Sequence, residues 1–248
     1  MKSKGKKQGG ANKRFGINKF PTTKGIIFWG ISMGRIGNAQ SPQKCREHLE
    51  HLASKVAWTE GIGVVMWYGD YLYFYSDRPA YQLRNKFMEL MISHKHAFIN
   101  RLRKDRKWTL QAFSFNTFGR LLLDNSGVFQ GAYKIVQRMY KTDKDFKTLV
   151  NNDYQGAGHN AGDNEFSFIL EEITAFYLAQ KGVLKLGNEF VKDSEKEWIL
   201  QVYPGKPLKS EIYLFQKNPL KLSNPKNQYE NSYYDLEEQV LYDYLKED

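Results

Sequence analysis

The chain has 248 residues, of which 41% are hydrophobic and 15% aromatic, so it is not disordered throughout and suits one domain with a sizeable core. Lysine and arginine outnumber aspartate and glutamate by 37 to 27, and the net charge of +10 indicates a polyanionic partner. No apolar run is long enough to span a membrane, so we expect no membrane partner. The single cysteine, Cys45, excludes an internal disulfide and is typical of a reducing cytoplasm.

Strands and helices are expected to alternate along the chain. Residues 1–21 are basic and predict a flexible tail, and residues 22–248 predict one domain. Strands are expected at 25–30, 62–68, 108–115, 183–186 and 198–203. Helices are expected at 42–58, 79–107, 163–180 and 236–245, with two or three more over 124–154. This alternation favours an α/β fold whose mostly parallel sheet is covered on both faces.

The first strand leads into a serine flanked by glycines, Gly30 to Gly34. This pattern is typical of the nucleophile elbow of α/β-hydrolases, where glycines allow a tight turn and the close approach of a substrate. A hydrolase serine needs a later histidine, and none of the five histidines lies in the final third of the chain. A dinucleotide-binding fingerprint over residues 32–37 would lack its first glycine, and no acidic residue ends the second strand before Asp70. A purely structural turn is the third interpretation.

The helix expected at 163–180 carries two adjacent glutamates in different surroundings. Its apolar face consists of Phe166, Ile169, Leu170, Ile173, Phe176 and Tyr177. A neighbouring stripe consists of Phe168, Glu172, Ala175 and Ala179, whose small members leave room for a ligand. We expect Glu171 to face water and Glu172, beside the apolar face, to have a perturbed pKa.

Basic residues recur along the helix expected at 79–107. Arg84, Lys95 and Arg106 are spaced by eleven residues, which is three helical turns, and Arg103 and Lys107 widen the stripe. This basic stripe favours binding of a phosphate backbone, and an ordinary solvated face is the alternative. The histidines lack carboxylate or thiolate companions, so we expect no metal site.

Together these features resemble the cyclodipeptide synthase family over residues 25–216. The serine turn Gly30 to Gly34 matches one family motif, and Phe168 with Glu172 matches an aromatic-x-x-x-Glu motif. Tyr203 matches a tyrosine at the end of a late strand, and Arg35 with Tyr203-Pro204 resembles the X-Tyr-Pro subfamily. Two departures are Phe168, where the family has tyrosine, and a longer segment between Glu172 and Tyr203.

The resemblance implies a Rossmann-type domain similar to the catalytic domains of tyrosyl- and tryptophanyl-tRNA synthetases. The resemblance implies no ATP chemistry, and the chain lacks the His-x-Gly-His and Lys-Met-Ser-Lys-Ser nucleotide signatures, so we expect no cofactor. Its substrates would be two aminoacyl-tRNAs used in sequence, and the basic stripe would bind tRNA phosphates without reading sequence. A cytoplasmic monomer is the expected form.

The resemblance also implies roles for individual residues. Ser32 would attack the ester of the first aminoacyl-tRNA, with backbone amides around Gly34 stabilising the oxyanion. Glu172 would bind the aminoacyl ammonium and relay a proton, and Tyr203 would assist the proton transfer of cyclisation. Substrate selectivity is expected to come from Phe28, Gly30, Ala175 and Gln201. The alternatives are a serine esterase that uses the same turn and a non-catalytic tRNA-binding module.

Overall fold

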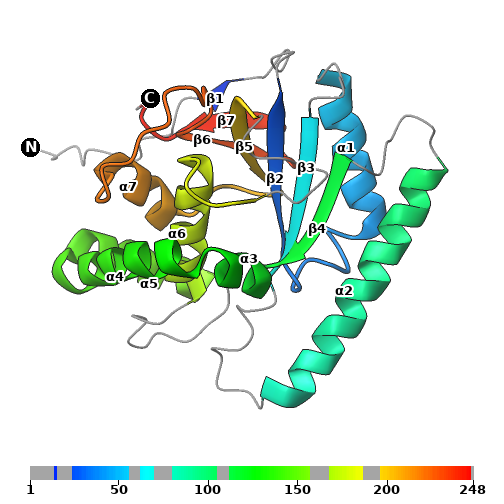
Figure 1. The fold of residues 1–248 in the computed structure, drawn as a ribbon, viewed down its shortest axis with the longest axis horizontal. Helices are drawn as coiled ribbons and strands as arrows, with labels where there is room; N and C mark the ends of the chain where they lie inside the picture. The colour runs from blue at the N-terminus through cyan, green and yellow to red at the C-terminus, as the bar shows by residue number, and fades with distance from the viewer. Residues whose placement is uncertain are drawn as a thin grey trace, which may run out of the picture.

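A seven-stranded sheet forms the centre of the protein (Figure 1). The computed structural model describes residues 14–15, 24–55, 62–69, 80–104, 112–156, 168–186 and 196–246. In chain order the strands are β1 (Arg14–Phe15), β2 (Gly25–Ile31), β3 (Ile62–Tyr68), β4 (Phe113–Thr117), β5 (Trp198–Tyr203), β6 (Ser232–Asp235) and β7 (Val240–Asp243). Their order across the sheet is β1-β7-β6-β5-β2-β3-β4. The five strands from β6 to β4 are parallel, and β7 and β1 are antiparallel additions at one edge.

Seven helices cover the two faces of this sheet in the described part of the chain. They are α1 (Pro42–Lys55), α2 (Ala80–Arg103), α3 (Phe118–Asp124), α4 (Ser126–Thr142), α5 (Lys144–Gly156), α6 (Phe168–Gln180) and α7 (Lys209–Lys217). Helices α1 and α2 pack on one face, and α3 to α7 pack on the other (Figure 1). The predicted α/β fold with a mostly parallel, doubly covered sheet is therefore confirmed.

Strand β2 lies in the middle of the sheet and contributes to both cores. Ile26 and Phe28 face the core under α3 to α7, whereas Ile27 and Trp29 face the core under α1 and α2. Because both faces are buried, the strand is apolar along its whole length, as is typical of parallel sheets. Its carboxyl end brings Ser32 to the edge of the sheet between β3 and β5.

Two predicted elements are wrong. Residues 183–186 form no strand, and residues 236–245 form a turn followed by β7 instead of a helix. The turn is fixed by Asp235, whose Oδ1 accepts hydrogen bonds from the amides of Glu237 and Glu238, and by Gln239 in the left-handed region at φ 58°. Strand β6 and helix α7 were not predicted.

Two other expectations were a flexible N-terminal tail and the absence of a membrane-spanning segment. Arg14 and Phe15 belong to the predicted tail and pair with β7 as β1, while residues 1–13 and 16–23 lie outside the described residues. None of the described helices is long and apolar enough to cross a bilayer.

Candidate active site

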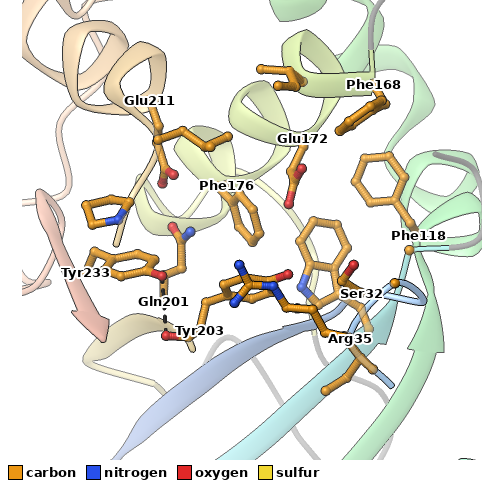
Figure 2. Close-up of a pocket in the computed structure, with 18 of the residues that line it drawn as sticks. Ser32, Arg35, Phe118, Phe168, Glu172, Phe176, Gln201, Tyr203, Glu211 and Tyr233 are labelled. Carbon is orange, nitrogen blue, oxygen red and sulfur yellow. Dashed lines mark hydrogen bonds between the residues drawn. The ribbon is translucent and has the colours of Figure 1, made fainter. Parts of the chain in front are cut away.

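A pocket of about 670 Å³ lies at the carboxyl ends of β2 and β5, beside α6 and α7 (Figure 2). This volume suits a small organic ligand. Eight residues singled out from the sequence line it: Gly30, Ser32, Gly34, Arg35, Phe168, Glu172, Gln201 and Tyr203. These residues come from segments that are far apart in the sequence, so the fold brings most of the predicted site together.

The turn that carries Ser32 is held by a buried amide. The Gln40 side chain accepts a hydrogen bond from the Ser32 backbone N–H at 2.8 Å and donates one to the Gly30 carbonyl at 2.6 Å. The Arg35 N–H closes the turn on the Ser32 carbonyl at 3.0 Å. Gln40 is fully buried, so it fixes the backbone on both sides of the serine without contact with solvent.

Gly30 is required in this turn for space and not for a left-handed backbone. Among the described residues, Gly182 and Gly205 are the glycines with positive φ, so neither Gly30 nor Gly34 supplies a left-handed conformation. A Cβ at Gly30 would lie 3.3 Å from both Phe176 Cζ and Trp67 Nε1, which is a tight contact. Gly30 is therefore needed for space beside the pocket.

A hydrogen-bonded chain supports Gln40 from the opposite face of the sheet. The carbonyl of Gln40 lies 2.8 Å from His94 Nε2, and His94 Nδ1 lies 3.0 Å from the Tyr68 hydroxyl. Burial lowers the pKa of His94, so the ring is neutral and its Nε2–H donates to the carbonyl. Cys45 also donates to this carbonyl at 3.4 Å, and burial raises the pKa of its thiol well above the usual range. Cys45 is thus a packed thiol, as predicted.

Glu172 projects from α6 into the pocket, where it faces a cation (Figure 2). Burial raises its pKa to about 7, and the Arg35 guanidinium acts in the opposite direction. The predicted perturbation of the Glu172 pKa is confirmed. At neutral pH this carboxyl is close to half ionised, which suits a group that both binds a cation and exchanges protons.

Glu171 does not face water, which corrects the prediction. It is 4% exposed, and its Oε2 has no hydrogen-bond partner among the described residues. Burial raises the pKa of Glu171 to about 8. The prediction failed because α6 packs against α4, α5, α7 and β5, so the helix has almost no exposed face on which to place a charge.

Tyr203 ends β5 beside the serine turn. Burial raises the pKa of its hydroxyl to about 12, the charge of Glu172 acts in the same direction, and Arg35 and a hydrogen bond with Ser32 act against them. The Arg35 guanidinium lies 5.3 Å from the centre of the Tyr203 ring and donates to the Pro204 carbonyl at 2.5 Å. Ser32, Glu172, Tyr203 and Arg35 therefore form one interacting group.

Three residues of the predicted site, namely Phe28, Ala175 and Pro204, do not line the pocket. Phe28 is fully buried and stacks on Trp67 at 4.6 Å between ring centroids. Ala175 lies on α6 and is fully buried in the hydrophobic core. The Pro204 carbonyl accepts a hydrogen bond from Arg35. The pocket surface beside Ser32 is formed instead by aromatic rings that the sequence did not assign to it, namely Trp67, Phe118 and Phe176.

The basic stripe is only partly described. Arg84 lies on α2, where its side chain is outside the described set, and Arg106 and Lys107 lie outside the described residues. Arg103 is exposed at the end of α2. Lys95 is half-buried, with its Nζ 5.2 Å from the centre of the Phe115 ring. The described part of the stripe is therefore short, and its binding role stays a prediction.

Sequence reasoning missed a second acidic group in the pocket. Glu211 lies on α7 and lines the cavity together with Tyr233 and Lys206. The spacing of Leu208, Glu211 and Phe215 is helical and is the signal that could have identified α7. No group of three or more histidine, cysteine, aspartate or glutamate residues able to hold a metal ion occurs in the described part of the chain.

Comparison with known proteins identifies the fold. No family model and no curated protein matches the sequence. A cyclodipeptide synthase from Bacillus thermoamylovorans matches the structure with a TM-score of 0.55 at 14% identity, covering 85% of this chain and 87% of that chain. The one from Staphylococcus haemolyticus gives a TM-score of 0.53 at 14% identity and covers 83% of this chain and 87% of that chain. The one from Fluoribacter dumoffii gives a TM-score of 0.51 at 12% identity and covers 78% of this chain and 82% of that chain. This chain has the fold of the cyclodipeptide synthases.

Proposed function

We propose that the protein is a cyclodipeptide synthase that converts two aminoacyl-tRNAs into a cyclic dipeptide. The observation that carries this proposal is the convergence of Ser32, Glu172, Tyr203 and Arg35 on one pocket. A nucleophile, a carboxyl that titrates near neutrality and a hydroxyl beside both are the groups that acyl transfer followed by aminolysis requires. The fold of the structural neighbours supports the same activity.

In the first step, Ser32 Oγ forms an ester bond to the aminoacyl carbonyl, and the bond from that carbonyl to the tRNA ribose oxygen breaks. The serine proton passes to the departing ribose oxygen, so the step is balanced. An aminoacyl ester is already activated, so a serine without a histidine partner suffices. The Ser32 and Arg35 amides are engaged in the turn, which leaves those of Met33 and Gly34 to bind the oxyanion.

In the second step, the amine held by Glu172 attacks the ester of the second aminoacyl-tRNA. An amide bond forms, the second tRNA leaves, and a dipeptidyl ester remains on Ser32. Glu172 receives the ammonium proton and returns it to the leaving oxygen. The free amine then attacks the Ser32 ester, the ring closes and the serine hydroxyl is restored, with Tyr203 beside Ser32 to assist the proton transfer.

The X-Tyr-Pro subfamily assignment is also part of this proposal. Arg35 binds the Pro204 carbonyl and lies over the Tyr203 ring, so the three residues of this signature are in contact. Phe168 lines the pocket where the family has tyrosine, so the substrate amine would depend on Glu172 without help from a hydroxyl at that position. The basic stripe on α2 would bind the phosphates of the tRNA acceptor stem.

The test is product formation from charged tRNA. The protein is incubated with a pool of aminoacyl-tRNAs, and cyclic dipeptides are sought by mass spectrometry. We expect products from the wild type, none from Ser32→Ala, and a loss of about 10²–10⁴-fold for Glu172→Gln. Ser126→Ala, at an exposed position on α4, is the matched control and should retain wild-type activity. Product formation by Ser32→Ala would contradict the covalent mechanism.

Two further measurements separate the alternatives. A serine esterase would hydrolyse a chromogenic ester without tRNA, whereas we expect no such turnover. A non-catalytic tRNA-binding module would bind tRNA equally well with or without an amino acid and would give no gain in intact mass. For the synthase, reversing Arg84, Lys95 and Arg106 to glutamate should weaken tRNA binding most strongly at physiological salt.

A further inference from the structure

The pocket ends, on the side away from Ser32, at a second buried carboxyl. Glu211 projects from α7 and is 2% exposed, yet it lines the cavity. Figure 2 shows Glu211 and Ser32 on opposite sides of the pocket, with Phe176 and Gln201 between them. The reaction steps proposed above use Ser32, Glu172 and Tyr203, and none of them assigns a role to Glu211.

The carboxyl of Glu211 is held in place by neutral groups. The Tyr244 hydroxyl donates to its Oε1 at 3.0 Å, and Tyr244 is itself fully buried. The Gln201 amide oxygen accepts from Gln180 Nε2 at 3.2 Å, which leaves the Gln201 NH₂ group for Glu211. These contacts orient the acid rigidly toward the cavity, so it is a built feature of the pocket wall.

No cation of the described residues forms an ion pair with Glu211. Burial raises its pKa to about 8, hydrogen bonds from Tyr244 and Gln201 lower it, and the negative charges of Glu172 and Asp153 raise it. An acid that is desolvated and lies near a second acid gains most from a cationic partner, because a hydrogen bond between charged groups is roughly twice as strong as one between neutral groups.

The position of Glu211 favours a side chain over an α-ammonium as that partner. In an aminoacyl ester on Ser32, the ammonium lies two bonds from the acyl carbon and therefore beside Glu172. Glu211, on the far side of Phe176 and Gln201, is placed for a group that extends away from the ester. A long basic side chain meets this requirement.

We propose that Glu211 selects a basic amino acid, namely lysine, arginine or histidine, for one of the two positions of the cyclic product. This inference rests on the proposed function, because it concerns the substrate of that reaction. Gln201 and Tyr233 flank the acid and supply further polar atoms to the cationic head group, while Phe176 packs against the aliphatic stem.

The first test uses the wild-type protein and a competition among substrates. Equal amounts of lysyl-, arginyl-, histidyl-, leucyl- and phenylalanyl-tRNA are supplied, and the cyclic dipeptides are identified by mass spectrometry. We expect products with a basic residue to exceed products without one by at least about 10-fold, the ratio that 1.4 kcal/mol gives. Cyclic dipeptides with only uncharged side chains would overturn this inference and leave the proposed function standing. No product from these five tRNAs, together with products from the full pool of aminoacyl-tRNAs, would overturn this inference alone, and no product from either would overturn both.

The second test changes the acid. Glu211→Gln keeps the shape and removes the charge, and we expect the yield of basic products relative to uncharged ones to fall at least about 10-fold. Glu50→Gln, at an exposed position on α1, is the matched control and should leave this ratio unchanged. A ratio that is the same in Glu211→Gln and wild type would overturn the inference. If Glu211→Gln does not fold, as judged by thermal unfolding, the product composition of the wild type still decides.

Discussion

Replacing Gln40 by leucine tests whether the serine turn depends on one buried amide. The leucine would fill a similar volume but would remove the acceptor for the Ser32 N–H and the donor to the Gly30 carbonyl. The Gly30 carbonyl, which is buried, and the Ser32 N–H, which is part-buried, would then both lose the Gln40 side chain as a partner. Each such group costs about 1–3 kcal/mol, so Gln40→Leu should lower the free energy of unfolding by about 2–6 kcal/mol.

The assay is equilibrium unfolding in urea, followed by intact-mass measurement of acyl transfer to Ser32 from aminoacyl-tRNA. Gln43→Leu is the matched control, because Gln43 is exposed on α1 and its amide donates to the exposed Glu47 carboxylate. We expect the control to change stability by less than about 0.5 kcal/mol. Equal stabilities for Gln40→Leu and Gln43→Leu would refute the reasoning, as would a destabilised Gln40→Leu protein that acylates at the wild-type rate.

Three other predictions concern charge and space near the pocket. Burial raises the pKa of Glu171 to about 8 from 4.5, so the folded protein keeps a proton that the unfolded chain releases, and stability falls as the pH rises from about 4.5 to 8. The free energy of unfolding of Glu171→Gln should therefore be compared with that of the wild type at pH 4.5 and at pH 8. We expect the difference, variant minus wild type, to be larger at pH 8 by on the order of 1–4 kcal/mol. A difference that urea unfolding finds equal at the two pH values would contradict this. Gly30→Ala places a methyl group 3.3 Å from two rings and should reduce product yield by at least about 10-fold, whereas Gly131→Ala, with open space on α4, should stabilise the protein by about 0.5–1 kcal/mol. Arg35→Gln removes the cation that opposes the raised pKa of Glu172, so the acidic limb of the pH–rate profile, expected near pH 7, should move to higher pH; an unmoved midpoint would exclude the pairing.

The parts of the fold that follow from local sequence were predicted well. Strands β2 and β3 are continuous apolar runs bounded by turns, and their observed bounds agree with the expected ones to within a residue. The position of the serine turn could be predicted because the turn comes directly after such a strand. These features depend on neighbours in the sequence, which a single chain reveals.

The failures arise where tertiary contacts decide the structure. The spacing of apolar residues from Leu236 to Leu245 fits a helix, but Asp235 fixes a reversal and β7 pairs with β6. Glu171 was wrongly expected to face water, because an amphipathic pattern does not identify an exposed face in a helix that is buried on almost every side. Glu211 was missed with α7, since nothing in the local sequence shows that this helix closes the pocket.

The connections that leave β2 and β5 have a consequence for how this protein can change. The two strands are neighbours, but the helix after β2 crosses one side of the sheet and the helix after β5 crosses the other. Such a topological switch point opens a crevice between diverging connections, and the pocket occupies it. Ser32 belongs to one connection, whereas Lys206, Leu208 and Glu211 belong to the other. Under the proposed function, substrate selectivity can therefore be changed by substitutions in the second connection without disturbing the backbone that positions Ser32.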